Sequence, residues 1–447
     1  MRVAILGFDV EGSASYDYFQ SQGHEVTICD QNPDITVPES AATQLGPDYL
    51  TGLDTFDLLV RTPGLKPSQI LEKNPAVANK ITTATNEFFK ACPSKNITGV
   101  TGTKGKGTTS TLIAKILEAA GNKVFLGGNI GIPVLSFLPE ISSDDFVVLE
   151  LSSFQLIDCQ YSPNVAVCLM VVPEHLNWHA DMAEYLEAKR QLFVHQTPND
   201  LAVYNANSEN SIEIVRSSPA VKGWYQTRPI EHLVGLSQEP ELGVVVQNGR
   251  IVAGVEDICG VQELALLGRH NWENVCAAIA ATWEITGHNK EAVRDVVTTF
   301  KGLEHRLELV DTVEGVAYYD DSFGTTPETA IVAVQAFREP KIVILGGSDK
   351  GASYTELAKA VKSGNVKYAV LIGQTAPDIE KALKAECFEA ILHGGNTMEE
   401  IIQTVREYAY EGDVVLLSTG CASFDMFKNY KDRGEQFRNA VDALKSS

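Results

Sequence analysis

The chain has 447 residues, of which 44% are hydrophobic and 21% charged, and its formal net charge is −22. These values are typical of a globular enzyme with about three domains, and so acidic a chain lacks the basic surface that binds a nucleic-acid backbone. Its eight cysteines include no CxxC pair, and no apolar run is long enough to span a bilayer. We therefore expect neither a zinc knuckle nor a disulfide framework, no nucleic-acid partner, no membrane insertion and a cytoplasmic location.

Residues 1–92 have the pattern of a small Rossmann-like α/β domain. An apolar strand within residues 3–12 runs into a glycine turn, a helix suits residues 16–22, and a second strand at 24–30 ends in an acid. This is the outline of a dinucleotide-binding fingerprint. Asp9, however, replaces the central glycine, and its carboxylate would crowd and repel a pyrophosphate. We therefore favour a domain that binds another nucleotide, or serves as a scaffold, over a nicotinamide oxidoreductase.

Residues 93–298 form a central domain headed by a glycine-rich loop at 99–109, between a short apolar strand and a helix. This order presents backbone N–H groups and a helix N-terminus to phosphates. Lys106 adds a mobile cation, and a hydroxyl just after it can reach Mg²⁺. The match to the usual phosphate loop is imperfect, because no glycine stands five places before Gly105 and Gly107 intervenes before Thr108. A plain glycine-rich turn is the alternative.

Strands at 122–128, 146–150 and 165–172 alternate with helices, which predicts a mostly parallel sheet. Ligands gather at the carboxyl ends of such strands, where Asn129, Glu150 and His175 fall. A carboxylate at Glu150 can hold Mg²⁺ against nucleotide phosphates; the alternative is a strand-end acid that faces water. His175 is either a metal ligand or a structural histidine.

Lys189 lies on the apolar face of the helix expected within 181–193, together with Leu186 and Phe193. A buried ammonium is costly unless it is paired or chemically altered. Either the side chain reaches out to solvent, or the lysine is carbamylated and becomes an anion that binds Mg²⁺. Farther along, Asn271 and Asn274 stand three apart on one helix face, where they either read a base edge or cap the helix.

Residues 299–447 form a third domain, also α/β and Rossmann-like, with strands at 341–346, 368–373 and 413–418. Arg306, near the second domain junction, either clamps a phosphate or ties two domains together. Residues 319–327 place two acids and three hydroxyls in one turn, which favours a ligand contact. Lys350 and the strand end at 418–427 could together hold a substrate that carries carboxylates.

These motifs resemble the Mur ligase family of peptidoglycan synthesis over the whole chain. The resemblance rests on residues 101–106, 149–155, 268–271, 303–306, and 421–429 with 432–434. It implies an ATP-dependent, ADP-forming ligase that phosphorylates the carboxylate of UDP-N-acetylmuramoyl-L-alanine and joins the acyl phosphate to the amine of D-glutamate. It also implies a three-domain α/β fold with a P-loop-type centre, ATP and two Mg²⁺ ions as cofactors, and a monomer whose partners are small molecules.

The resemblance assigns roles residue by residue. The ATP site would comprise Gly102, Thr103, Lys104, Gly105, Lys106, Gly107, Thr108, Thr109, Asn271, Arg306 and Asp321. Metal ligands would be Thr108, Glu150, His175 and carbamylated Lys189, and Lys106, His175 and Lys189 would be catalytic. Gly64, Asn129 and Ser153 would hold the UDP substrate, and Thr325, Lys350, Ser423 and Phe424 the glutamate.

The sequence departs from the family pattern at Gly107, at Phe323 and, more mildly, at residues 418–421, where Ser-Thr-Gly-Cys replaces Ser-Pro-Ala-Cys. Gly107 follows the loop lysine directly, as in folylpolyglutamate synthases, so a related ligase with another acceptor stays an alternative, as does a non-catalytic nucleotide-binding module. Phe323 stands where the family has lysine and removes a cation near phosphate or glutamate, for which another lysine must compensate. On charge alone, Phe323→Lys is expected to leave activity unchanged or to raise it.

Overall fold

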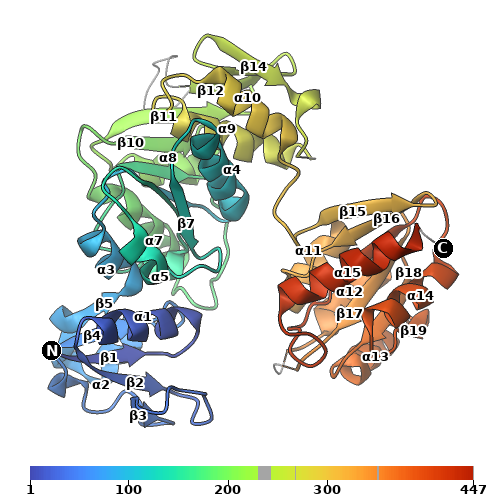
Figure 1. Ribbon diagram of the computed structural model, residues 1–447, viewed down its shortest axis with the longest axis horizontal. Coiled ribbons are helices and arrows are strands. Elements are labelled where there is room, and N and C mark those ends of the chain that lie inside the picture. Colours follow the sequence, from blue (N-terminus) through green and yellow to red (C-terminus); the bar gives the residue numbers. More distant parts are fainter. Residues whose placement is uncertain (230–242, 267, 350–351, 446–447) are drawn as a thin grey trace. The chain divides into compact units, whose positions relative to one another are not determined.

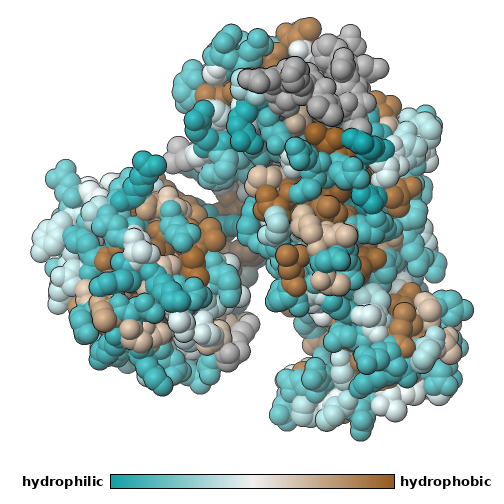
Figure 2. Space-filling model, turned by 180° about the vertical axis from the view of Figure 1, so that it is seen from behind, coloured by the Kyte–Doolittle hydropathy of each residue, from teal (hydrophilic) through white to brown (hydrophobic). Residues whose placement is uncertain are grey.

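The structure is a computed structural model that describes residues 1–229, 243–266, 268–349 and 352–445. The chain forms two compact units, Met1–Phe300 and Lys301–Ser447, and each is built of helices packed on a sheet (Figure 1). The first unit contains two sheets and the second contains one. The visible surface of each unit is mainly hydrophilic, with scattered hydrophobic patches (Figure 2).

The first sheet has five parallel strands in the order β3-β2-β1-β4-β5. The strands are β1 Arg2–Leu6, β2 Glu25–Asp30, β3 Ala42–Leu45, β4 Leu58–Arg61 and β5 Ile81–Thr83, and the helices are α1 Val10–Ser21, α2 Pro67–Lys73 and α3 Ala84–Ala91. The apolar side chains of β1 are fully buried on both faces of the sheet, as expected for a central parallel strand. Helix α1 begins earlier than expected because Asp9 caps its N-terminus.

The second sheet has nine strands in the order β14-β13-β12-β11-β10-β9-β6-β8-β7, in which only the β12–β13 and β13–β14 pairs are antiparallel. The strands are β6 Ile97–Thr101, β7 Val124–Gly128, β8 Phe146–Glu150, β9 Val165–Cys168, β10 Leu201–Asn205, β11 Val221–Gln226, β12 Gly243–Gln247, β13 Arg250–Ala253 and β14 Glu256–Gly260. Its helices are α4 Lys106–Ala119, α5 Val134–Phe137, α6 Ser153–Leu156, α7 Met182–Val194, α8 Glu209–Val215, α9 His270–Thr282 and α10 Lys290–Thr299.

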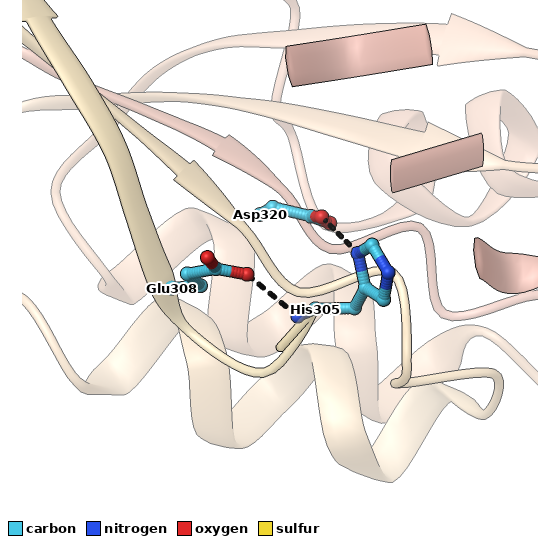
Figure 3. A group of neighbouring side chains, drawn as sticks. All are labelled: His305, Glu308 and Asp320. Atoms are coloured by element: carbon cyan, nitrogen blue, oxygen red, sulfur yellow. Dashed lines mark hydrogen bonds and ion pairs between the residues drawn. The ribbon is translucent and has the colours of Figure 1, made fainter. Parts of the chain in front are cut away.

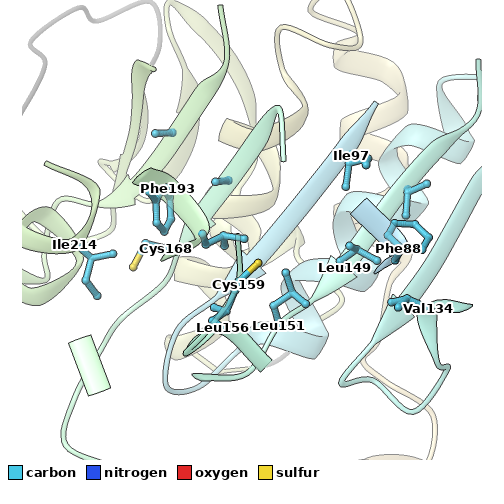
Figure 4. Close-up of a cluster of buried hydrophobic side chains, with 14 of the residues drawn as sticks. Phe88, Ile97, Val134, Leu149, Leu151, Leu156, Cys159, Cys168, Phe193 and Ile214 are labelled. Atoms are coloured by element: carbon cyan, nitrogen blue, oxygen red, sulfur yellow. The ribbon is translucent and has the colours of Figure 1, made fainter. Parts of the chain in front are cut away.

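The hydrophobic core of this region contains side chains from β6 and from the strands that flank it on either side, β8 and β9. Leu149, Leu151 and Cys168 are completely buried among them (Figure 4). Strand β9 ends at Cys168, four residues before the expected end. The chain leaves the sheet there because the next residues pair with the glycine-rich loop: the Thr103 N–H donates to Met170 O at 2.9 Å.

The second unit contains a six-stranded sheet in the order β15-β16-β20-β17-β18-β19, in which only the β15–β16 pair is antiparallel. The strands are β15 Glu308–Val313, β16 Val316–Asp320, β17 Lys341–Gly346, β18 Val366–Ile372, β19 Ile391–His393 and β20 Val414–Leu417. The helices are α11 Pro327–Gln335, α12 Thr355–Ser363, α13 Ala376–Ala385, α14 Met398–Tyr408 and α15 Tyr430–Leu444. Two apolar clusters cover the two faces of this sheet.

The predicted α/β class with mostly parallel sheets is therefore confirmed. Among the residues described, no helix combines the length and the apolar character that crossing a membrane requires.

Candidate active site

The glycine-rich loop between β6 and α4 is held tightly by its neighbours. Gly102 and Gly105 have φ values of 152° and 86°, a region that disfavours other residues. A Cβ on Gly105 would lie 2.1 Å from the Asn274 side-chain oxygen, and one on Gly102 would lie 2.6 Å from Leu169 Cβ. Gly105 is also the N-cap of α4 and supplies no capping side chain. No side chain of the N-cap residue therefore competes with an anion at the N-terminus of α4.

The corresponding turn before α1 differs in this respect. The Asp9 carboxylate accepts hydrogen bonds from the N–H groups of Glu11 at 3.1 Å and Gly12 at 3.2 Å. A carboxylate of the chain itself therefore fills this helix N-terminus and opposes a second anion there. The contrast favours α4, and not α1, as the phosphate-binding helix of the first unit.

Two lysines converge on one carbonyl oxygen of the loop. Lys106 Nζ donates to Gly102 O at 3.2 Å and to Thr103 O at 3.1 Å, and Lys189 Nζ donates to Gly102 O at 2.9 Å. Lys189 is only 1% exposed, so the alternative in which it reaches solvent is wrong. Burial, and then the charge of Lys106, lower the pKa of Lys189 to about 7. Its amine therefore loses its proton far more readily than a surface lysine does.

Helix α7 also supports the loop through Tyr185. The Tyr185 hydroxyl lies 3.0 Å from Thr103 Oγ1, and its ring centroid lies 4.4 Å from the Lys189 ammonium. Thr103 Oγ1 further donates to Val172 O at 3.0 Å. The Thr103 hydroxyl is therefore used within the fold, which leaves its backbone as the part that can face a ligand. Lys104 is exposed and forms an ion pair with Glu174.

Helix α9 closes the other side of the loop with Asn271 and Asn274, which are both buried. Asn274 Nδ2 donates to Asn271 Oδ1 at 2.7 Å, and Asn274 Oδ1 accepts from Thr109 Oγ1 at 3.3 Å. Arg269 is the N-cap of α9, so the helix-capping alternative for the two asparagines is wrong. Because Asn274 engages the hydroxyl of Thr109, the half-buried Thr108 is the better candidate for a metal ligand.

Glu150 and Asn129 meet at the carboxyl ends of neighbouring strands. Asn129 Nδ2 donates to Glu150 Oε1 at 2.8 Å, and the Asn129 N–H donates to Glu150 O at 2.8 Å. Glu150 is 6% exposed and pairs in register with Val100 of β6, so the alternative of a solvent-facing acid is wrong. A shielded carboxylate beside strand β6, which leads into the glycine-rich loop, is a suitable Mg²⁺ ligand.

His175 lies in the segment after β9 and has a left-handed backbone with φ of 59°. Its side chain is 45% exposed, and Nε2 lies 3.8 Å from a Glu174 carboxylate oxygen. Burial lowers the pKa of His175, Glu174 opposes this, and the positive charges of Lys106 and Lys189 lower it further. A neutral imidazole near these lysines can bind a metal or accept a proton.

Sequence reasoning missed His179, which is 2% exposed. Its Nδ1 lies 3.3 Å from Glu184 Oε2 and its Nε2 lies 2.9 Å from Ser153 Oγ. Burial lowers the pKa of His179, and in the neutral ring Nδ1 donates to the carboxylate while Nε2 accepts from the Ser153 hydroxyl. The four-residue spacing from His175 was the available signal. His179 thus links Ser153 to the N-terminal turn of α7.

The first sheet reaches this region at two further points. Trp178 Nε1 donates to Gly64 O at 3.3 Å. Arg61 is 1% exposed, pairs with Asp158 and donates to Phe154 O at 3.0 Å. The end of β4 therefore contacts α6, the next helix after Glu150 in the chain.

A groove of about 690 Å³ lies between α1 and α5. Phe8, Tyr18 and Leu135 give it an apolar lining, and Asp17 and Ser136 add polar groups. This mixture suits a ligand with a flat ring and several hydroxyl groups.

In the second unit, Asp321 follows β16 and is 5% exposed. It accepts from Ser418 Oγ at 2.6 Å and from the Leu307 N–H at 3.1 Å. Burial raises the pKa of Asp321 to about 6, against the lowering effect of these hydrogen bonds and of Arg306. Asp321 thus joins the turn that carries Arg306 to the end of β20.

A second buried acid, Asp320, also stabilises the turn that carries Arg306. His305 Nδ1 donates to Asp320 Oδ2 at 2.7 Å, and the His305 N–H donates to Glu308 Oε2 at 2.9 Å (Figure 3). Although the ligand atoms of these three residues lie within 4.8 Å of one another, the His305 and Asp320 side chains are engaged with each other. Asp320 also accepts from the Ser322 N–H at 2.8 Å. We infer that these hydrogen bonds stabilise the turn around His305.

Two of the glutamate-site candidates, Ser423 and Phe424, follow a segment that a buried arginine contacts. Arg433 is fully buried and donates to Cys421 O at 3.1 Å and to Ser322 O at 2.8 Å. It thereby joins the turn after β16 to the strand-end segment that contains Ser423, which is buried, and Phe424, which is 69% exposed. Thr325 lies just before α11. Lys350 lies outside the described residues.

Comparison with known proteins assigns the two regions to one family. Residues 100–282 match the Mur ligase middle domain, and residues 305–421 match the Mur ligase, glutamate ligase domain. The UDP-N-acetylmuramoylalanine--D-glutamate ligase of Ruminiclostridium cellulolyticum is 36% identical over 99% of this chain and 97% of that protein. The protein of the same name from Symbiobacterium thermophilum is 37% identical over 99% and 98%.

Solved structures agree at the level of the fold. The UDP-N-acetylmuramate-alanine ligase of Thermotoga maritima matches with a TM-score of 0.56 at 17% identity, over 100% of this chain and 99% of that one. The MurF ligase of the same organism, in complex with ADP, matches with a TM-score of 0.54 at 17% identity, over 99% and 94%. The family models and the full-length relatives together show that this chain belongs to the Mur ligase family.

Proposed function

We propose that this protein is the ATP-dependent ligase that adds D-glutamate to UDP-N-acetylmuramoyl-L-alanine, releasing ADP and phosphate, in peptidoglycan precursor synthesis. The full-length similarity to ligases named for this reaction supports the choice of substrates. The observation that carries the chemistry is the convergence of Lys106 and Lys189 on the carbonyl oxygen of Gly102, at an uncapped helix N-terminus. We further propose that the protein acts in the cytoplasm as a monomer.

The three sheets support a division into three functional domains. Residues 1–92 form a Rossmann-like domain for the UDP substrate, residues 93–298 a P-loop-type domain for ATP, and residues 299–447 a Rossmann-like domain for the amino acid. Each range contains one sheet. The end of α10 at Thr299 and the end of the first compact unit at Phe300 support a boundary near residue 298.

ATP would bind with its phosphates on the backbone of residues 102–109 and its terminal phosphates beside Lys106. The N-terminus of α4, which its N-cap Gly105 leaves without a capping side chain, favours this placement. Asn271 would contact the base, Arg306 the terminal phosphate and Asp321 the ribose. The Asp321 carboxylate is well suited to accept from ribose hydroxyls because Ser418 and Leu307 fix its orientation.

Glu150 and Thr108 would hold one Mg²⁺ ion, and His175 and a carbamylated Lys189 a second. The donor set fits, because oxygen ligands from a shielded carboxylate and a hydroxyl suit Mg²⁺. An amine with a pKa of about 7 is sufficiently deprotonated at neutral pH to add carbon dioxide. When bound, the ions would neutralise charge on the phosphates and on the reacting carboxylate.

The acceptor substrate would lie between the first sheet and the phosphate loop. The groove beside Phe8, Tyr18 and Leu135 would take the uridine part, and Gly64, Asn129 and Ser153 would contact the rest of this substrate. Ser153 is oriented by His179 at 2.9 Å. Thr325, Lys350, Ser423 and Phe424 would hold glutamate.

In the reaction, a carboxylate oxygen of the acceptor attacks the terminal phosphorus of ATP and ADP leaves. The amine of glutamate then attacks the carbonyl carbon of the acyl phosphate, loses a proton to a base and expels phosphate. Lys106 and the loop N–H groups stabilise the negative charge that develops in the first step. His175, whose pKa burial and the neighbouring lysines lower, would assist the loss of this proton in addition to its role at the second ion.

Phosphate release tests this proposal. Phosphate is expected only when ATP, UDP-N-acetylmuramoyl-L-alanine and D-glutamate are all present, and L-glutamate should not replace the D-enantiomer. A panel with folate acceptors and longer muramoyl peptides tests the alternative ligases. Turnover with one of those acceptors, and none with UDP-N-acetylmuramoyl-L-alanine, would overturn the substrate assignment.

A further inference from the structure

Phe323 occupies a fixed position in the turn after β16. Its N–H donates to His305 O at 2.8 Å. Its ring packs edge-on against Tyr430, with centroids 5.4 Å apart and an interplanar angle of 88°. The residue keeps 37% of its surface exposed. One face of a well-anchored ring is therefore open to a neighbour.

That neighbour is Arg306. Its guanidinium carbon lies 5.9 Å from the centroid of the Phe323 ring, within the range of a cation–π contact. The backbone on both sides of Arg306 is fixed, because the N–H of His305 donates to Glu308 and that of Leu307 donates to Asp321. His305 and Leu307 also have left-handed φ values of 61° and 46°. The backbone is thus set, while the exposed side chain retains rotational freedom that a ring can restrict.

We propose that Phe323 is a positioning residue that holds the guanidinium of Arg306 in the orientation needed to meet the terminal phosphate of ATP. This inference rests on the proposed function, which assigns that phosphate contact to Arg306. The ring restricts the side chain before ATP arrives, so less conformational entropy is lost on binding. Arg306 is the group that touches the nucleotide, and Phe323 acts through it.

This role reverses the expectation from charge alone. A lysine at position 323 would add a cation, but it would also remove the ring and place a like charge beside Arg306. Repulsion between the two would turn the guanidinium away from the position that the ring defines. With phenylalanine at position 323 the site has one cation fewer, but the remaining cation, Arg306, is held in its binding orientation.

The test compares three substitutions by the KM for ATP and by kcat, at saturating acceptor and D-glutamate. Phe323→Leu is expected to raise the KM for ATP about three- to fivefold with a smaller effect on kcat. Phe323→Tyr keeps the ring and should restore wild-type values. Phe323→Lys should raise the KM for ATP in spite of its added charge. A lower KM in Phe323→Lys would overturn the proposal.

A double-mutant cycle separates positioning from general packing. In an Arg306→Ala background, Phe323→Leu should cause no further rise in the KM for ATP. An equal rise in both backgrounds would contradict the proposal. Phe337→Leu is the matched control, because Phe337 packs on Tyr319 with centroids 4.5 Å apart and should not alter the KM. Wild-type protein without glutamate-dependent ATP turnover would instead overturn the proposed function itself.

Discussion

Lys189 donates a hydrogen bond to the carbonyl oxygen of Gly102 at 2.9 Å, from a helix that begins 80 positions later in the chain. The same oxygen accepts from Lys106 at 3.2 Å. A buried amine and a catalytic candidate thus share one backbone acceptor in the glycine-rich loop. The position of this loop therefore depends on α7 as much as on its own glycines.

Replacement of Lys106 by Met is expected to abolish turnover, with a loss of at least about 10³-fold in kcat, because the charge on the transferring phosphoryl group then lacks its cation. The fold should persist, since Lys106 is only partly buried. Phosphate release under saturating substrates measures the effect. Lys115→Ala, an exposed lysine on the same helix, is the control and should retain wild-type activity.

Lys189→Ala should also lower activity strongly, and wild-type protein depleted of bicarbonate should partly mimic it. The physical reason is that a buried amine with a pKa of about 7 is free to form a carbamate. Labelled ¹³C-bicarbonate should give a carbamate NMR signal in the wild type that is absent in Lys189→Ala. A wild type that is fully active without bicarbonate and shows no such signal would contradict carbamylation.

The raised pKa of Asp321 should make the stability of the folded chain depend on pH. This pKa is raised from 3.8 to about 6 by burial, so between these values the folded chain binds more protons than the unfolded chain. The free energy of unfolding therefore falls as pH rises from about 4 to about 6 through this group, and the effect is complete above pH 6. Asp321→Asn should flatten that part of the profile in urea titrations. Equal slopes for variant and wild type would be inconsistent with the shift.

Asp321→Asn should also weaken ATP binding, by about 1–2 kcal/mol, because an amide is a poorer acceptor for ribose hydroxyls than a carboxylate. The KM for ATP measures this effect, while the KM for D-glutamate should change little. An unchanged KM for ATP would remove Asp321 from the proposed ribose site.

Arg61→Met is expected to destabilise the first unit by about 3 kcal/mol, because it leaves Asp158 without its partner and the carbonyl of Phe154 without a donor. Urea unfolding of the variant measures this. Since Phe154 packs against His175 and His179, the KM for the UDP substrate should also rise. Arg190→Met, which breaks a surface ion pair with Glu187, should change stability by less than about 1 kcal/mol.

Local patterns predicted the parts of the site that lie within one strand–loop–helix unit. The loop glycines and Lys106 belong to the unit of β6 and α4, and Glu150 ends the neighbouring strand β8. Local spacing and apolar runs were enough to identify all of them as candidates. The burial of Lys189 was predicted from its helix face, and the structure excludes its escape to solvent.

The rest depends on contacts between distant segments. Arg61 meets Asp158 across 97 positions, and Ser418 meets Asp321 across the same interval. The residue pattern within one segment does not indicate which distant residue its side chains will contact. His179 was missed for a similar reason, because its role is defined by Ser153 and Glu184, which lie on separate elements. The Arg306–Phe323 contact likewise depends on the turn around Arg306, which Asp320 and Asp321 stabilise from a different segment.

The central claim is that a carboxylate of the acceptor is phosphorylated and then joined to D-glutamate. The most direct measurement uses UDP-N-acetylmuramoyl-L-alanine labelled with ¹⁸O in its carboxylate, together with ATP and D-glutamate, and determines the masses of the released phosphate and of the product. The account predicts one ¹⁸O in each phosphate formed and an amide product heavier by one glutamate residue. Phosphate that contains no ¹⁸O, or an acceptor recovered unchanged while ATP is consumed, would contradict it.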